Sequence, residues 1–187
     1  MATISVDSSA RPVSALLAAR ILEDADLIAG MLALVPAGSE DWRPADWPLS
    51  TDGTAPFTIG RLHAHLAESL AGVCGCLYRL HPVELSHLNA LRERFHEASI
   101  FDALRRAAAQ GFALVTDAEL TQRLPTVFSP EGAPFLETLL INWKHLEHHA
   151  YQLFLYLKLL GVPVSTRQLY RFRPVVAGKL ARRDELR

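Results

Sequence analysis

The chain has 187 residues, of which half are hydrophobic and 21% are charged, and its formal net charge is −1. This length and balance fit one globular domain with a single core. The near-zero charge gives no reason to expect nucleic acid as a partner. The first residues lack the basic start and long apolar core of a signal peptide, and no apolar run is long and charge-free enough to span a bilayer. We therefore expect a cytoplasmic protein with no membrane contact.

Four segments place apolar residues at helical spacing, which predicts an all-α fold of the four-helix-bundle type with long inter-helix loops. Thr58 is a possible N-cap of the second segment, and Gly161 with the following Val and Pro is a stop signal for the fourth. Residues 1–12 are expected to be a flexible lead, 13–163 the bundle, and 164–187 a basic extension with a short final helix. The expected helices run from about Val13 to Val35, Thr58 to Leu80, Ser99 to Gly111 or slightly beyond, and Pro134 to Leu160.

The connections between these segments are long. Residues 36–56 are rich in Pro, Gly, Asp and Ser and carry Trp42 and Trp47, which favours an ordered loop that packs over another part of the molecule. Alternatively, the two indoles only close one end of the core. A second connection, residues 81–97, has room for a short helix from about Leu85 to Phe95. Residues 116–120 predict a turn or a short helical start, and no segment shows the alternation of a strand.

The fourth segment carries His145 and His149 four residues apart. Residues at this spacing lie one above the other on a helix, so two imidazoles so placed can chelate one transition metal ion. The alternative is a pair of core histidines, although two aligned buried imidazoles are costly to leave without partners. On a helical wheel Asn142 shares their edge of the apolar arc, whereas His148 points further away.

Open metal sites usually take three protein ligands, and the second segment offers His63 and His65 at opposite edges of its apolar arc. The wheel alone leaves the choice between these two open. If it is not a ligand, His65 is expected to be a core histidine with a hydrogen-bond partner. The remaining histidines are expected to lie on the surface or in loops: His81, His87, His96, His148 and, if it is not a ligand, His63. Cys74 and Cys76 point in different directions on a helix, so they are expected to be reduced, packed thiols.

Two motifs resemble those of the DinB/YfiT-like family. The segment FTIGRLHAHLA, from Phe57 to Ala67, is similar to that family's second-helix motif, and HLEHHAYQL, from His145 to Leu153, resembles its last-helix motif. The loop from Asp41 to Pro44 and the segment Leu159 to Val162 also resemble family positions. The likeness covers roughly Val13 to Val164.

This resemblance implies a four-helix bundle, often dimeric, in which three His hold a divalent metal. The ligands it implies here are His65, His145 and His149. Ala150 and Tyr151 depart from the family pattern, which often has Arg and Gly at these positions. Three imidazoles suit zinc or nickel, and also copper or iron.

Three neutral ligands would leave a coordination position open for water, a thiolate or a substrate oxygen. Some family members resemble metal-dependent transferases or isomerases that use a low-molecular-weight thiol. We therefore expect a metal-dependent hydrolase or a thiol-dependent transferase acting on a small molecule, or else a non-catalytic, stress-related metal-binding protein or a structural dimer. Asn142, Gln152, Trp42 and Trp47 are candidates for supporting the ligands or lining a substrate pocket. The sequence identifies no catalytic acid or base, and Glu68 and Glu147 are expected to be surface charges.

Overall fold

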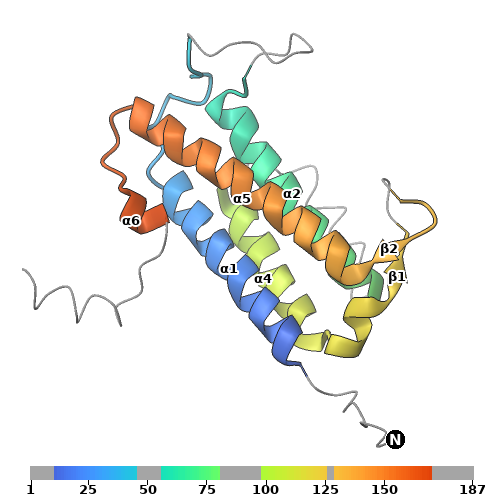
Figure 1. The fold of residues 1–187 in the computed structure, drawn as a ribbon. Coiled ribbons are helices and arrows are strands. Elements are labelled where there is room, and N and C mark those ends of the chain that lie inside the picture. Colours follow the sequence, from blue (N-terminus) through green and yellow to red (C-terminus); the bar gives the residue numbers. More distant parts are fainter. Residues whose placement is uncertain (1–10, 46–55, 81–97, 126–128, 170–187) are drawn as a thin grey trace, which may run out of the picture.

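The computed structural model describes residues 11–45, 56–80, 98–125 and 129–169, and this part of the chain is mostly helical (Figure 1). One turn of 3-10 helix, η1 (Asp117–Thr121), and two strands of two residues each complete it. The strands pair antiparallel, with Arg123 opposite Pro134 and Leu124 opposite Ala133. The elements are α1 (Pro12–Leu32), α2 (Ile59–Leu80), α4 (Ala98–Leu114), β1 (Arg123–Leu124), β2 (Ala133–Pro134), α5 (Phe135–Leu159) and α6 (Thr166–Leu169).

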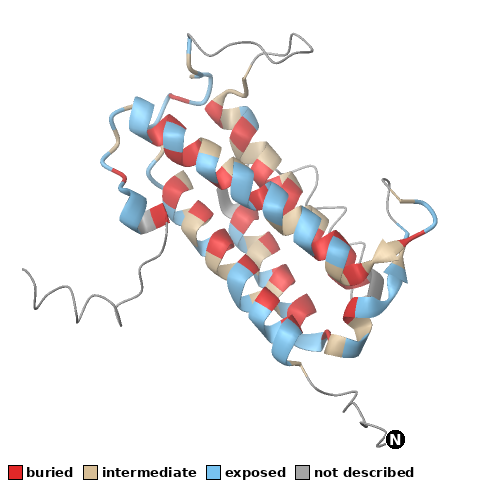
Figure 2. Ribbon diagram, in the orientation of Figure 1, coloured by how far each residue is buried: buried red, intermediate tan, exposed pale blue. Residues whose placement is uncertain are grey.

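The four long helices pack side by side, and each contacts two of the others. The helix α1 packs on α4 and α5, and α2 packs on the same two helices from the other side. Their buried faces meet along the axis of this arrangement (Figure 2), where Leu, Ile and Phe side chains form one core. The predicted all-α class is confirmed. Because α2 and α5 are direct neighbours, polar residues on their shared edge are brought close together.

The observed helices follow the predicted ones closely. The Thr58 hydroxyl accepts a hydrogen bond from the Arg61 backbone N–H at 3.2 Å, as expected for an N-cap. At the end of α5, Gly161 has a φ of 77°, and the N–H of Val162 bonds to the Leu157 carbonyl at 2.9 Å. This left-handed glycine ends the helix as predicted.

The third helix continues past Gly111 to Leu114. Gly111 is buried at the contact between α4 and α2, where an added Cβ would lie 2.9 Å from the Leu77 Cβ. The glycine therefore permits close helix packing and is not a stop signal. Trp47 and the short helix expected from Leu85 to Phe95 lie outside the described residues.

One local feature departs from the expectations. The paired strands β1 and β2 are not predicted by the sequence, because two residues are too few to show alternation. The turn or short helical start expected at residues 116–120 is the 3-10 helix η1, in which the Glu119 carboxylate accepts the N–H of Thr116 at 2.8 Å. Within the part of the chain that the structure describes, no helix has the length and apolar character needed to cross a membrane.

Asp117 of η1 caps the start of α1, more than a hundred residues away in sequence. Its carboxylate accepts the backbone N–H groups of Val13 at 3.0 Å and Ser14 at 2.8 Å. These are donors that a helix N-terminus leaves without partners. Partial burial raises the pKa of Asp117, but the hydrogen bonds from Ser14 and Val13 and the charge of Arg11 outweigh that effect and lower it.

Replacing Asp117 with alanine is expected to lower the thermal unfolding midpoint. Because the folded pKa of Asp117 lies below its unfolded value, this stabilisation is present above the unfolded pKa and is lost as pH falls through the folded pKa. Thermal scans of the wild type and Asp117→Ala at neutral and acidic pH would measure both effects, with the exposed Asp41→Ala as control. A difference between wild type and Asp117→Ala that stays unchanged at acidic pH would contradict the capping role.

Candidate metal centre

Three histidines from α2 and α5 converge at the contact between these helices. His65 comes from α2, and His145 and His149 lie one turn apart on α5, so that one ring nitrogen of each lies within 4.8 Å of the others. The His65 and His145 Nε2 atoms are 2.9 Å apart. Two nitrogens bound tetrahedrally to one zinc ion lie roughly 3.4 Å apart, so the cluster is close to the spacing that one ion requires. His63, the alternative that the wheel left open, lies outside this cluster.

Two of the three imidazoles are held through their other ring nitrogen. His65 Nδ1 lies 3.1 Å from Glu68 Oε2, and His149 Nδ1 lies 3.0 Å from Gln152 Oε1. An oxygen acceptor at Nδ1 favours the tautomer that carries the proton there, which leaves the Nε2 lone pair available to a metal. Both partners follow their histidine by three residues, on the same helix.

The support of His149 extends to the segment that precedes α2. Gln152 Nε2 donates to the Tyr156 hydroxyl at 2.9 Å, and this hydroxyl donates to the Phe57 carbonyl at 3.0 Å. Tyr156 is fully buried, and burial raises the pKa of its phenol even though the hydrogen bond from Gln152 lowers it. The phenol therefore stays protonated and remains a donor, and the chain of hydrogen bonds fixes His149 relative to α2.

The environment of His145 and His149 favours their neutral form by lowering the pKa of both side chains. Burial lowers the pKa of His145, and the neighbouring His65 and His148 lower it further. Burial also lowers the pKa of His149, although its hydrogen bond to Gln152 acts in the opposite direction. Since a metal ion binds the neutral imidazole, protons compete weakly with a metal at these two side chains near neutral pH.

The cluster has an apolar wall on one side and is more open on the other. The Phe57 ring lies 5.0 Å from the His65 ring and stacks on His149 at 5.9 Å, both between centroids. His145 is the most exposed of the three ligand candidates. Trp42 lies further away, where its ring meets the edge of Tyr156 at 5.5 Å. Trp42 therefore packs against a residue that supports the cluster, and not against the histidines themselves.

Asn142, one turn before His145, is directed elsewhere. Its amide nitrogen donates to the Thr138 carbonyl at 2.8 Å and lies 3.9 Å from Cys76 Sγ. It also fills the space beside Gly72, where an added Cβ would come within 2.6 Å of the Asn142 amide oxygen. Asn142 thus sets the close approach of α2 and α5, and its hydrogen bonds in the described residues do not reach the histidines.

One sequence expectation needs correction. His63 was expected on the surface if it were not a ligand, but it is half-buried, its pKa is lowered by burial, and its Nε2 has no hydrogen-bond partner among the described residues. Glu68 was expected to be a surface charge, and its side chain is 39% exposed; it also accepts a hydrogen bond from His65 and lies 3.7 Å from Arg61. The signal that could have identified Glu68 and Gln152 together is their shared position three residues after a candidate ligand. His148 is exposed, as predicted.

No protein-family model, curated protein or solved structure matches this chain. The geometry of the three histidines therefore carries the functional argument. Three imidazole nitrogens, two of them on rings held at Nδ1, together with one apolar wall and one exposed side, fit a divalent metal ion that keeps a coordination position open.

Proposed function

We propose that this chain is a DinB-like four-helix bundle that binds one divalent transition metal ion through His65, His145 and His149. The observation that carries the proposal is the convergence of three ring nitrogens within 4.8 Å, with two of the rings held at Nδ1 by oxygen acceptors. An all-imidazole ligand set suits zinc and nickel best, and also admits copper and iron. The resemblance of the two histidine-bearing helices to the DinB/YfiT-like motifs supports the same ligand set.

A coordination position left open on the metal ion could hold a water molecule or a thiol. When bound, the metal would supply a Lewis acid that lowers the pKa of a coordinated water or thiol. Glu68 and Gln152 hold the His65 and His149 rings in orientation, and Phe57 excludes water from one side of the cluster. We infer hydrolysis or transfer of a low-molecular-weight thiol to a small apolar molecule as the reaction class.

A non-catalytic metal-binding role is the second candidate, and one observation favours it. The polar groups nearest the cluster already have partners: Glu68 contacts His65 and Arg61, and Gln152 contacts His149 and Tyr156. The described residues at the cluster therefore include no spare carboxylate to act as a general base. Turnover of thiol-dependent and hydrolytic substrates by the metal-loaded protein distinguishes the two roles.

Metal content of the purified full chain tests the binding site. We expect about one zinc or nickel ion per chain in the wild type and in His148→Ala, and none in His149→Ala. His148 is the matched control, because it is the adjacent residue on α5 and is exposed. Circular dichroism would show that each variant is folded. Metal retained in full by a folded His149→Ala would remove His149 from the ligand set.

A further inference from the structure

The hydrogen bonds that start at His149 end on a backbone carbonyl, and this end point sets the direction of each bond in the chain. A carbonyl can only accept, so the Tyr156 hydroxyl donates its one proton to the Phe57 carbonyl at 3.0 Å. With that proton committed, the hydroxyl can only accept from the Gln152 side chain, which lies 2.9 Å away. The Gln152 amide therefore turns Nε2 toward Tyr156 and Oε1 toward His149.

The orientation of this amide decides which ring nitrogen of His149 carries the proton. Gln152 Oε1 only accepts and lies 3.0 Å from His149 Nδ1, so Nδ1 must be the protonated nitrogen. A neutral imidazole has one such proton, which leaves the Nε2 lone pair for a metal ion. With the amide turned round, its NH2 group would face Nδ1, the proton would move to Nε2, and that nitrogen could not bind a metal.

The shape of the Gln152 side chain does not enforce this orientation. The two ends of a side-chain amide are nearly alike in size, so packing accepts either orientation and the hydrogen-bond partner decides between them. His65 needs no such partner, because Glu68 accepts from it with a carboxylate, and both oxygens of a carboxylate are acceptors. The tautomer of His149 therefore depends on a third residue, whereas that of His65 does not.

We propose that Tyr156 is a positioning residue that selects the metal-binding tautomer of His149 by fixing the Gln152 amide. Tyr156 follows Gln152 by about one turn of α5 and is fully buried, and the edge contact with the Trp42 ring at 5.5 Å holds its ring in place. Phe57 contributes twice, with its ring as a wall of the cluster and with its carbonyl as the end of the chain. The effect on metal binding rests on the proposed three-histidine site, whereas the tautomer is set within the protein alone.

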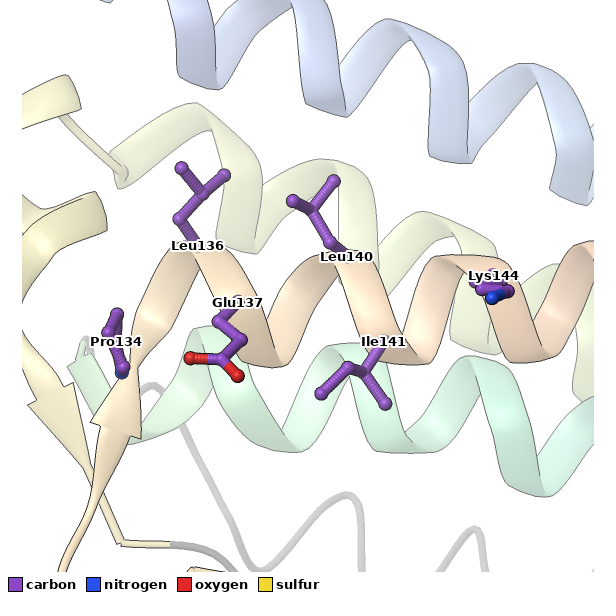
Figure 3. Close-up of a pocket in the computed structure, with 6 residues that line it drawn as sticks. All are labelled: Pro134, Leu136, Glu137, Leu140, Ile141 and Lys144. Carbon is purple, nitrogen blue, oxygen red and sulfur yellow. The ribbon is translucent and has the colours of Figure 1, made fainter.

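This hydrogen-bond chain lies in the second half of α5, apart from the open surface on the first half. Figure 3 shows that surface, which is lined by six residues of β2 and the first half of α5: Pro134, Leu136, Glu137, Leu140, Ile141 and Lys144. None of them takes part in the bonds that link His149 to Phe57. Ile141 is 58% exposed, so Ile141→Ala changes α5 without touching the hydrogen-bond chain and serves as a control.

NMR of the metal-free full chain measures the tautomer of His149 directly. At a pH where His149 is neutral, long-range proton–nitrogen correlations distinguish a proton on Nδ1 from one on Nε2. We expect the Nδ1–H form in the wild type and a shift toward the Nε2–H form in Tyr156→Phe, which deletes one oxygen and keeps the ring. Tyr78→Phe is the matched control, because Tyr78 is also buried and its hydroxyl donates to the Ala107 carbonyl at 3.2 Å. Tyr78→Phe and Ile141→Ala should both keep the Nδ1–H form.

Several results of this experiment would overturn the proposal. One is an Nε2–H form of His149 in the wild type, and another is an unchanged Nδ1–H form in folded Tyr156→Phe. An equal shift in Tyr78→Phe would also overturn it, because the change would then follow from lost stability and not from the hydrogen-bond chain.

A carboxylate in place of the amide should remove the need for Tyr156. Gln152→Glu presents an acceptor to His149 in either orientation, so Tyr156→Phe combined with Gln152→Glu should recover the Nδ1–H form. If Tyr156 acted through packing alone, the double variant would show the same tautomer as Tyr156→Phe. That result would overturn the proposal.

Zinc affinity connects the tautomer to the proposed metal centre. An ion that binds one of two forms is held more weakly by the fraction of molecules in that form, so about one fifth of His149 as Nδ1–H would give about fivefold weaker binding. We expect such a severalfold loss in Tyr156→Phe, matching the population that NMR measures, and none in Tyr78→Phe. A shifted tautomer with unchanged zinc affinity would keep the role of Tyr156 at His149 but overturn its use in metal binding, and with it the proposed ligand set.

Discussion

Replacing His65 with alanine is expected to lower the affinity for zinc or nickel by at least about a hundredfold while leaving the helices folded. The substitution removes one of three nitrogen donors and leaves two imidazoles on α5, which cannot enclose an ion. His65 lies at the edge of the contact between α2 and α5 and is only partly buried, so its loss opens no cavity in the core. Competition against a chromophoric chelator would measure the affinity of each variant.

Replacing Glu68, whose carboxylate holds His65, should weaken metal binding less than replacing His65 does in the same assay. Glu68→Ala removes the acceptor at His65 Nδ1 but keeps all three donors, and losses of this kind typically weaken metal binding by about tenfold to a hundredfold. Glu147→Ala is the control, because Glu147 is an exposed acid on α5, two residues after His145. Equal affinities for wild type, Glu68→Ala and His65→Ala would contradict both the ligand assignment and the supporting role of Glu68.

Replacing Leu66, the residue after His65, should lower stability and leave metal binding in place. Leu66 is fully buried in the core, and Leu66→Ala is expected to lower the free energy of unfolding by about 2–5 kcal/mol. The loss combines the transfer free energy of the deleted methyl groups with the cavity that the core cannot close. Urea denaturation of the metal-free protein, followed by circular dichroism, would measure the change.

A matched substitution separates burial from residue type. Leu16→Ala deletes the same atoms from a side chain that is 58% exposed, so it should change the free energy of unfolding by less than about 0.5 kcal/mol. Folded Leu66→Ala should still bind one metal ion per chain, because all three histidines remain. A Leu66→Ala variant as stable as the wild type would show that α2 does not pack as described.

The helices were predictable because their apolar spacing is regular over many turns. The sequence placed the start of α2 at Thr58 and the end of α5 at Gly161, where a cap and a left-handed glycine give local signals. The end of α4 was less well defined, since Gly111 serves packing against Leu77 and gives no local stop signal.

The pair His145 and His149 could be predicted from helical spacing, but their partner on α2 could not. His63 and His65 lie at opposite edges of the same apolar arc, so the choice depends on which edge of α2 faces α5. The packing of α2 against α5 brings His65, and not His63, to the cluster. The family resemblance implied the same residue.

Some of the residues that make the supporting contacts follow a local sequence pattern, whereas others are brought together only by the fold. Glu68 and Gln152 follow their histidines by three residues, so this local pattern was available in the sequence. The hydrogen bond from Tyr156 to the Phe57 carbonyl joins residues 99 positions apart, and no periodicity predicts it. The same is true of Asp117, which reaches α1 only after the chain has folded.

X-ray absorption at the zinc edge of the zinc-loaded full chain tests the central claim most directly. We predict three imidazole nitrogens at about 2.0–2.1 Å together with one further light-atom ligand, and a loss of imidazole scattering in His149→Ala. A sulfur neighbour at about 2.3 Å would place the ion at Cys74 or Cys76 instead. That result, or a zinc ion with no imidazole in its first shell, would contradict the three-histidine site.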